Sequence, residues 1–245
     1  AAPRKEQRLS LSCVANGTKA QFRDANFPVD AEGRVYHLGV KRGEVANRIL
    51  SVGDEKRAAL LAGLLDPPKD GEEVYSVKSS RGFVLHTGRL DGVPVSIIAT
   101  GMGTPMMDFV VREARAVVDG QMAIVRLGTC GLIDGESPVG TVVLASEGSV
   151  LVRREPDWFN HDGDATHHTP YSISKPVHAD EQLSATAERE LAASLAQIGR
   201  EMKTGLNASA DSFYSSQGRQ GTSFNDSNTD LLDAILADHP QATSL

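Results

Sequence analysis

The stretch VPVSIIATGMGTPMMDFVVREARAVVDGQMAIVRLGT, residues 93–129, decides the fold class because it places a helical pattern between two apolar runs. VPVSIIATG is short and rich in β-branched residues, which is typical of a buried strand. In MMDFVVREARAVVDG, apolar residues recur at helical spacings up to Gly120, which predicts an amphipathic helix closed by that glycine. MAIVRLGT then predicts a second buried strand.

The same alternation of strand and helix patterns precedes this stretch. RILSVG, Arg48–Gly53, predicts a buried strand, and DEKRAALLAGLLD, Asp54–Asp66, predicts a helix that the following prolines end. Asp91-Gly92 is a hairpin turn signal between FVLHTGRL and VPVSIIATG. These segments therefore predict further strands beside the first pair.

The alternation also continues downstream. VGTVVLAS, residues 139–146, predicts a buried strand, and residues 153–172 predict a long surface loop. Residues 180–199 predict an amphipathic helix, and residues 229–239 predict another, with Thr229 as its N-cap. Strands that alternate with helices predict an α/β fold with a mixed, mainly parallel central sheet flanked by helices.

Size and composition restrict the function. The chain has 245 residues, enough for one large domain or two small ones, and its net charge of −7 argues against broad nucleic-acid binding. No apolar run approaches the about 18 residues that a membrane helix needs. Residues 1–34 are predicted to be a flexible N-terminal extension and residues 35–245 a single domain. Cys13 lies in that extension and Cys130 in a Gly-rich turn, so no disulfide is expected and the predicted location is cytoplasmic.

Ligands of open α/β sheets bind beyond the carboxyl ends of the strands, and two turns at predicted strand ends, SVGDEKR and VRLGTCG, indicate an anion site there. In SVGDEKR, Gly53 can expose backbone N–H groups to an anion, and Arg57 lies in the first helical turn, where a cation is unfavourable unless an anion binds. A solvent-exposed arginine is the alternative. ATGMGTP, Ala99–Pro105, is a Gly-rich turn that tight packing explains equally well.

The turn VRLGTCG places Arg126 inside an apolar strand. A buried guanidinium needs a carboxylate or a bound anion, so a structural ion pair is the alternative to an anion site. Thr129 can supply a hydroxyl, and Gly131 lets the backbone approach a ligand.

The stretch SFYSSQGRQ, residues 212–220, groups an amide and a guanidinium near an aromatic ring. In an extended segment Gln217 and Arg219 would point the same way, beside Phe213. A polar surface loop is the alternative. The adjacent His167 and His168 lack zinc-ligand spacing, and no motif for a covalent nucleophile is present.

Six segments in order, YHLGV, SVGDEKR, SSRGF, ATGMGTP, VRLGTCG and SADSFYSSQGR, resemble the nucleoside phosphorylase family over residues 35–245. The Gln-x-Arg pair is similar to that of the uridine phosphorylases within it. The resemblance implies reversible phosphorolysis of uridine to uracil and ribose 1-phosphate, a pentosyltransferase reaction of pyrimidine salvage, with deoxyuridine and thymidine as further candidate substrates. A purine nucleoside phosphorylase, a nucleosidase and a non-catalytic nucleoside- or phosphate-binding protein remain alternatives.

The resemblance also implies a role for each candidate residue. It implies phosphate binding by Gly53, Arg57, Arg126, Thr129 and the Arg81 of a neighbouring subunit. It implies nucleoside binding by Phe213, Gln217, Arg219, Gly131 and the neighbour's His37, which would reach the ribose 5′-hydroxyl. Arg219, Gln217 and Arg126 would be the catalytic residues, phosphate a co-substrate without any cofactor, and the assembly a homodimer, alone or as a trimer of dimers.

A Gln amide can accept a hydrogen bond from the ring N–H of uracil and donate one to its carbonyl, whereas Arg only donates. That pair suits uracil or thymine and would reject cytosine. The family's ribose-binding Glu-Met-Glu is expected just after HPQATSL, where the chain stops at Leu245, so the domain is expected to be incomplete at its C-terminus. Gly82 stands where some relatives have a metal-binding Glu, so no metal is predicted.

Overall fold

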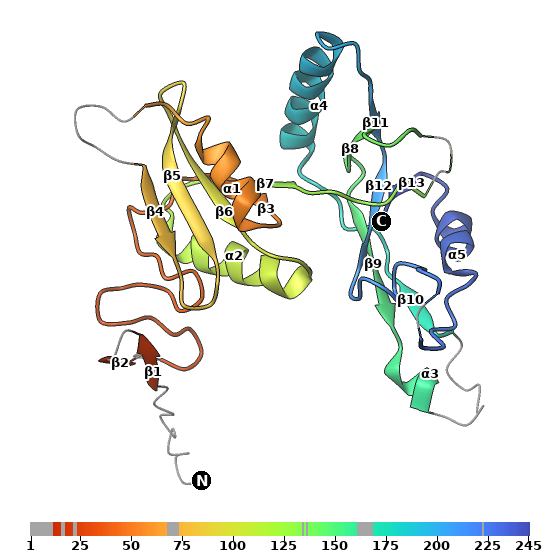
Figure 1. Ribbon diagram of the computed structural model, residues 1–245, viewed down its shortest axis with the longest axis horizontal. Helices are drawn as coiled ribbons and strands as arrows, with labels where there is room; N and C mark the ends of the chain where they lie inside the picture. The colour runs from red at the N-terminus through yellow and green to blue at the C-terminus, as the bar shows by residue number, and fades with distance from the viewer. Residues whose placement is uncertain are drawn as a thin grey trace, which may run out of the picture. The chain divides into compact units, whose positions relative to one another are not determined.

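The computed structural model describes residues 12–15, 18–21, 24–67, 74–133, 135, 137–160, 169–221 and 223–245. The chain forms two compact units, residues 1–128 and residues 129–245 (Figure 1). The adjacent His167 and His168 lie outside the described residues. Within the described ranges, no helix is long and apolar enough to cross a membrane.

The first unit contains a five-stranded mixed sheet in the order β4-β5-β6-β3-β7. Strand β3 runs parallel to both β6 and β7, whereas β4, β5 and β6 are antiparallel neighbours. The predicted hairpin at Asp91-Gly92 is confirmed, with left-handed φ angles of 51° and 77°. The strands are β3 (Arg48–Val52), β4 (Tyr75–Lys78), β5 (Val84–Leu90), β6 (Val93–Ala99) and β7 (Ala123–Leu127).

Helices α1 (Glu55–Ala62) and α2 (Thr104–Val117) cover opposite faces of this sheet (Figure 1). Successive strand residues point to opposite faces, and along β6 Ile98 packs with the α2 core whereas Ile97 and Ala99 pack with the α1 core. The predicted α/β fold with helices flanking a mixed sheet is therefore confirmed.

The ends of both helices differ from the prediction. Asp54 caps α1 by accepting from the backbone N–H of Arg57 at 2.9 Å, but the helix ends at Ala62 rather than Asp66. Asp66 instead accepts the backbone N–H groups of Asp91 and Gly92, at 2.8 and 2.7 Å. The Asp66 carboxylate is thus bound to the hairpin turn, which is why the helix does not extend to this residue.

Helix α2 ends at Val117, three residues before Gly120. Val118 takes an extended conformation, and the Arg115 side chain donates hydrogen bonds to the carbonyls of Val118 and Gly120. The arginine therefore holds the segment that follows the last helical residue, Val117.

Strand β7 was predicted to be buried, but Val125 and Leu127 are 41% and 45% exposed. The reason is its place in the sheet, because among the described strands it pairs only with β3 and forms an edge.

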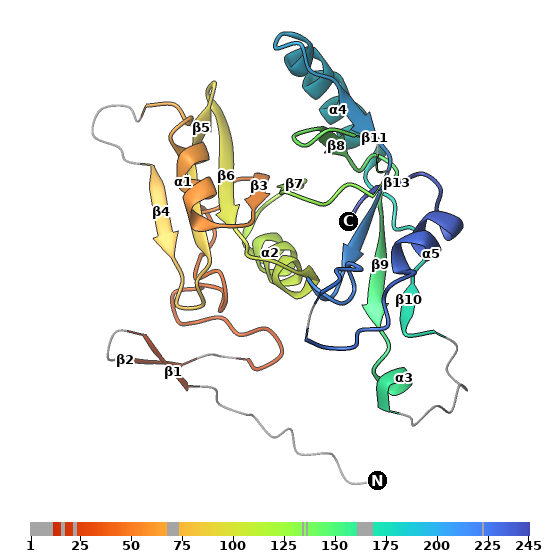
Figure 2. The ribbon, with the colours of Figure 1, turned by 45° about the vertical axis from the view of Figure 1, so that its right-hand side comes forward.

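The second unit contains a four-stranded sheet in the order β10-β9-β12-β13 and a separate parallel pair, β8 with β11. Strand β12 runs parallel to β9 and β13, and α5 (Leu231–Asp238) packs on this sheet through Leu231 and Ile235 (Figure 2). Helix α4 (Glu181–Ala196) contacts β8 and β11. The strands are β8 (Val142–Leu144), β9 (Ser149–Arg154), β10 (Tyr171–Ile173), β11 (Met202–Thr204), β12 (Leu206–Ala210) and β13 (Ala242–Ser244).

Two local predictions in the second unit were wrong. Residues 153–172 do not form only a loop, since they include helix α3 (Pro156–Asn160), whose Phe159 packs edge-on against Tyr171 at a centroid distance of 6.2 Å. Asp230 rather than Thr229 occupies the N-cap position of α5, and it makes no side-chain capping bond.

Part of the predicted N-terminal extension forms two paired strands. Strands β1 (Ser12–Ala15) and β2 (Thr18–Gln21) pair in antiparallel register. The flexibility of residues 1–34, and a single domain over residues 35–245, stay predictions.

An ion pair in the first unit should make its stability depend on pH. Arg34 donates to both carboxylate oxygens of Glu44, at 2.6 and 2.7 Å. Burial raises the pKa of Glu44, but hydrogen bonds from Arg34 and Tyr75 outweigh it, so the pKa lies below its ordinary value. Glu44→Gln should therefore lower the free energy of unfolding at pH 7 by about 2 kcal/mol.

A carboxylate with a lowered pKa stabilises the fold above its unfolded-state pKa, and this contribution is lost as pH falls through the folded-state pKa. The difference between wild type and Glu44→Gln should shrink below about pH 4.5, as denaturant unfolding at several pH values would measure. Glu55→Gln, which removes an exposed pair with Lys78, is the control and should have almost no effect. A difference that stayed constant down to low pH would contradict this account.

Candidate functional site

The carboxyl ends of three parallel strands, β3, β6 and β7, meet at one edge of the first unit's sheet. The N–H groups of Thr100 and Gly101 donate to the carbonyls of Val52 and Gly53, at 2.8 and 3.1 Å. Strand β7 brings Arg126 into register with Ser51. The turns predicted to bind a ligand therefore lie side by side, joined largely by main-chain bonds.

Arg126 is anchored at this edge by two hydrogen bonds. Its Nη1 donates to Ser51 Oγ at 3.1 Å, and its Nη2 donates to the Gly101 carbonyl at 2.9 Å. Ser51 is fully buried, so its hydroxyl is a fixed acceptor. These bonds leave the guanidinium beside the turn at Gly53.

Arg57 approaches the same turn from α1. A Cβ placed on Gly53 would lie 3.7 Å from Arg57 Nη1 and 3.8 Å from Arg126 Nη2. The structure therefore brings Gly53, Arg57 and Arg126 together, as predicted, with two guanidinium groups beside a turn that carries no side chain.

The charges of this cluster are not balanced within the described residues. Arg57 Nη2 lies 3.6 Å from Asp54 Oδ2, whereas no carboxylate in the described part of the chain pairs with Arg126. The predicted burial of Arg126 is wrong, because the edge strand β7 leaves this residue exposed. Partial desolvation of the guanidinium nevertheless lowers the pKa of Arg126, and the nearby charge of Arg57 lowers it further. A bound anion would relieve this repulsion, and an anion site at this edge of the sheet stays a prediction.

Arg81 and His37 form a second cluster in the same unit, around Tyr36. The Arg81 guanidinium lies over the Tyr36 ring at 4.6 Å, and the His37 ring meets that ring edge-on at 4.8 Å. His37 also stacks on Phe109 at 3.8 Å.

Glu113, which holds His37, was not expected from the sequence. Its carboxylate lies 2.6 Å from His37 Nδ1, and the residue is only 5% exposed. An acidic residue within the buried stripe of an amphipathic helix was the signal that could have found it.

The remaining predicted residues belong to the second unit. Arg219 Nε donates to Gln217 Oε1 at 3.1 Å and to the Phe213 carbonyl at 3.0 Å, and its guanidinium lies 4.1 Å from the centre of the Phe213 ring. The structure therefore brings Phe213, Gln217 and Arg219 together in what we call the amide–guanidinium turn, residues 212–220.

This segment is a turn and not the extended segment that was expected. Gly218 has a left-handed φ of 65°, and the N–H groups of Gly218 and Arg219 donate back to the carbonyls of Ser215 and Tyr214. The left-handed conformation of this glycine places the side chains of Gln217 and Arg219 on the same side of the turn.

Asn228, also not expected from the sequence, holds the amide–guanidinium turn in place. Its Nδ2 donates to the carbonyls of Ser215 and Arg219 at 2.8 and 3.2 Å, and its Oδ1 accepts from Gln220 Nε2 at 3.0 Å. Asn228 is 5% exposed. No periodic pattern in the sequence marks a buried side-chain amide that bonds to two carbonyls, so Asn228 could not be found in that way.

Removing this amide should open the turn. Asn228→Ala loses three hydrogen bonds in a buried place, and a cost of about 2 kcal/mol would raise the opened fraction about thirtyfold. Limited trypsin digestion, which cuts after Arg219 in the opened turn, should therefore be faster by about that factor. Asn225→Ala, an exposed substitution nearby, is the control. Equal cleavage rates for both variants would show that Asn228 does not hold the turn.

Thr129 and Gly131 lie at the start of the second unit. Thr129 is exposed, and Gly131 exchanges main-chain hydrogen bonds with Leu245, at 2.8 and 3.0 Å. Within the described residues, no hydrogen bond links Thr129 or Gly131 to the amide–guanidinium turn. Their predicted roles stay predictions.

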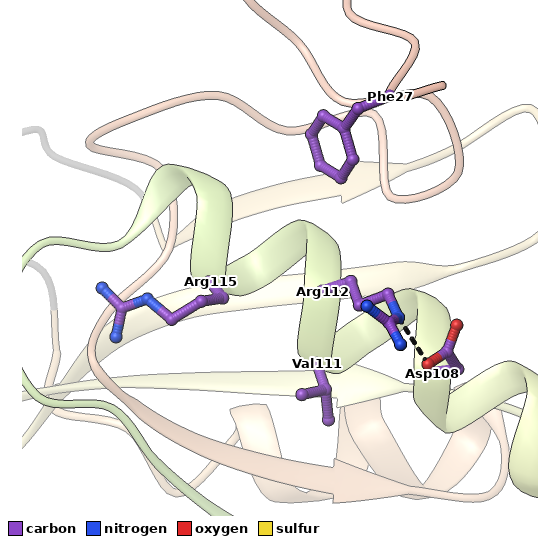
Figure 3. Close-up of a pocket in the computed structure, with 5 residues that line it drawn as sticks. All are labelled: Phe27, Asp108, Val111, Arg112 and Arg115. Carbon is purple, nitrogen blue, oxygen red and sulfur yellow. Dashed lines mark hydrogen bonds and ion pairs between the residues drawn. The ribbon is translucent and has the colours of Figure 1, made fainter. Parts of the chain in front are cut away.

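A surface hollow of about 510 Å³ lies elsewhere on the first unit, along the outward face of α2 (Figure 3). Arg112 and Asp108 form an ion pair across one helical turn, at 2.7 Å, beside Val111. The hollow contains none of the predicted site residues, and its lining consists of Phe27, Asp108, Val111, Arg112 and Arg115.

Comparisons with known proteins identify the family of the chain. The family model described as the phosphorylase superfamily matches residues 47–234. The uridine phosphorylase of Thermococcus kodakarensis is 31% identical over 201 residues, which are 82% of this chain and 64% of that protein. The DeoD-type purine nucleoside phosphorylase of Geobacillus kaustophilus is 29% identical over 185 residues, 74% of this chain and 68% of that protein. The chain thus spans less than two thirds of the length of that uridine phosphorylase.

One solved structure is similar over most of its own length. It comes from a structural and catalytic study of uridine phosphorylases in the oomycete Phytophthora capsici. It is 41% identical, with a TM-score of 0.83, and the match covers 91% of this chain and 79% of that one.

Proposed function

Since the chain belongs to the phosphorylase superfamily, we propose that it catalyses the reversible phosphorolysis of uridine to uracil and ribose 1-phosphate. The observation that carries the proposal is the pair of guanidinium groups, Arg57 and Arg126, beside the bare turn at Gly53. The uridine phosphorylases among its relatives support the choice of reaction. In this proposal inorganic phosphate is a co-substrate and no cofactor takes part.

Phosphate would bind between Arg57 and Arg126 at the ends of the parallel strands. In the reaction, a phosphate oxygen bonds to C1′ of the nucleoside while the bond between C1′ and N1 of uracil breaks. The electron pair of that bond goes to uracil, and the proton of hydrogen phosphate ends on uracil. The ribosyl carbon is cationic at the transition state, so a fixed phosphate dianion stabilises it without a carboxylate nucleophile.

Uracil would be held by Gln217 and Arg219. As uracil leaves, negative charge spreads over its ring nitrogens and carbonyl oxygens, where a guanidinium and an amide N–H donate charge-assisted hydrogen bonds. Gln217 Oε1 accepts from Arg219 Nε in this structure, and its second lone pair can accept the uracil ring N–H. The Arg219 guanidinium lies over the ring of Phe213. Phe213 would pack against the base or the sugar.

A homodimer would complete the site. In this proposal Arg81 of one subunit reaches the phosphate of the other, and His37 reaches the ribose 5′-hydroxyl. Thr129 and Gly131 would contact phosphate and nucleoside, and the cytoplasm is the proposed location.

A purine nucleoside phosphorylase is the second candidate, because a DeoD-type relative matches over 74% of this chain. Gln217 and Arg219 favour the pyrimidine. The ring N–H of uracil lies between two carbonyl acceptors, which one amide oxygen and the N–H donors of Gln and Arg can complement.

The test is the release of uracil from uridine by the purified protein, with and without phosphate. We expect release that requires phosphate and yields ribose 1-phosphate in equal amount, with inosine and cytidine inert. Equal release without phosphate would reject phosphorolysis, and turnover of inosine alone would favour the purine activity.

A further inference from the structure

Glu113 is a buried acid that the proposed mechanism does not use. It lies on α2, and its side chain is 6% exposed. Its oxygens accept the backbone N–H of His37 at 3.0 Å and that of Leu38 at 2.8 Å. A buried carboxylate is costly unless it is hydrogen-bonded, and these two backbone N–H groups supply such bonds.

A further contact of Glu113, to the His37 side chain, fixes the imidazole ring. His37 Nδ1 lies 2.6 Å from Glu113 Oε1. An ionised carboxylate only accepts hydrogen bonds, so Nδ1 must carry the proton, and in the neutral ring Nε2 is then an acceptor. Phe109 stacks on the ring at 3.8 Å with an interplanar angle of 20°, which limits its rotation.

The other edge of the ring is open. The His37 side chain is 25% exposed, and within the described residues no hydrogen bond to Nε2 is formed. The ring is thus oriented on one edge and available on the other.

We propose that Glu113 is a positioning residue, which fixes the tautomer of His37 so that Nε2 accepts a hydrogen bond from a substrate hydroxyl. The proposal rests on the proposed function, in which that hydroxyl is the ribose 5′-hydroxyl. It predicts a specificity: a 5′ group that donates a hydrogen bond is preferred over one that can only accept. Glu113 acts through His37 and touches no substrate.

The first test is the protonation of His37 in Glu113→Gln. The Gln oxygen must face the N–H groups of His37 and Leu38, which turns its NH₂ toward Nδ1, and Nδ1 must then accept. Nitrogen-15 NMR should find the proton on Nδ1 in wild type and on Nε2 in the variant. The chain has seven histidines, and His37→Gln identifies the signal. A protonated Nε2 in wild type, or no change in the variant, would overturn the proposal.

The matched control is Asp108→Asn, an acid-to-amide change on the outward face of the same helix (Figure 3). It should leave the His37 spectrum unchanged. Thermal unfolding of both variants verifies that they are folded before the spectra are compared.

The second test compares turnover of uridine and of 5′-deoxy-5′-fluorouridine, whose 5′ group cannot donate. Wild type should prefer uridine by about tenfold in kcat/KM, the value of one hydrogen bond, and Glu113→Gln should narrow the ratio to about twofold. A purely structural role would lower both values equally and keep the ratio, which would overturn the proposal. If wild type turned over neither nucleoside, the proposed function would fail, and the NMR result would still decide the role of Glu113.

Discussion

Replacing Arg126 with glutamine should reduce phosphate-dependent release of uracil by about a hundredfold to a thousandfold. Arg126 is held by Ser51 and the Gly101 carbonyl at the strand ends, so its guanidinium is positioned before phosphate arrives. Loss of one preorganised donor to a developing charge typically costs that much in rate. The apparent KM for phosphate should rise as well, whereas the KM for uridine should change little. Initial rates over a matrix of both substrate concentrations would separate the two constants.

The control for this substitution is Arg48→Gln. Arg48 begins β3, the strand that ends beside Arg126, and its side chain is exposed. Its replacement should leave both KM values and the rate within about twofold, because surface substitutions are usually near neutral. If Arg126→Gln behaved like this control, Arg126 would not hold phosphate.

Gln217→Leu should lower kcat/KM for uridine by about a hundredfold and leave the KM for phosphate unchanged. Leucine has a similar size but can neither accept the uracil ring N–H nor donate to its carbonyl. A site built to hydrogen-bond its substrate loses heavily when a polar group of that pair is left unpaired. Steady-state kinetics with uridine and phosphate varied separately would measure the effect.

Gln197→Leu, at the exposed end of α4, is the control for the amide-to-leucine change and should be neutral. An equal rise in the KM for phosphate in Gln217→Leu would point to a general collapse of the site. Unchanged turnover of uridine would remove Gln217 from base recognition.

The strand ends could be predicted well from the sequence. Apolar β-branched runs define β3, β6 and β7, and the carboxyl ends of parallel strands must meet, so Gly53 and Arg126 could be expected at one edge. The helix ends were less predictable, because Asp66 bonds to a hairpin distant in sequence and Arg115 bonds to carbonyls beyond the last helical residue.

The turns and buried polar contacts were the least predictable. A single left-handed glycine, Gly218, decides how Gln217 and Arg219 meet, and nothing in their spacing reveals it. Asn228 and Glu113 act through contacts with residues distant in sequence, 13 residues away for Ser215 and 76 for His37. Such pairings depend on the tertiary fold, which local patterns do not encode.

The cradle at the strand ends is tied together by amide groups of the chain itself, from Thr100 and Gly101 to Val52 and Gly53. Mutation of neighbouring side chains leaves those donors and acceptors in place. In the proposed function, base recognition depends instead on the side chains of one short turn, residues 212–220, where Arg219 bonds to Gln217 and Phe213. If the chain has the proposed activity, a few codon changes in this turn would therefore be enough to exchange the accepted nucleobase, while the binding of inorganic phosphate would be retained.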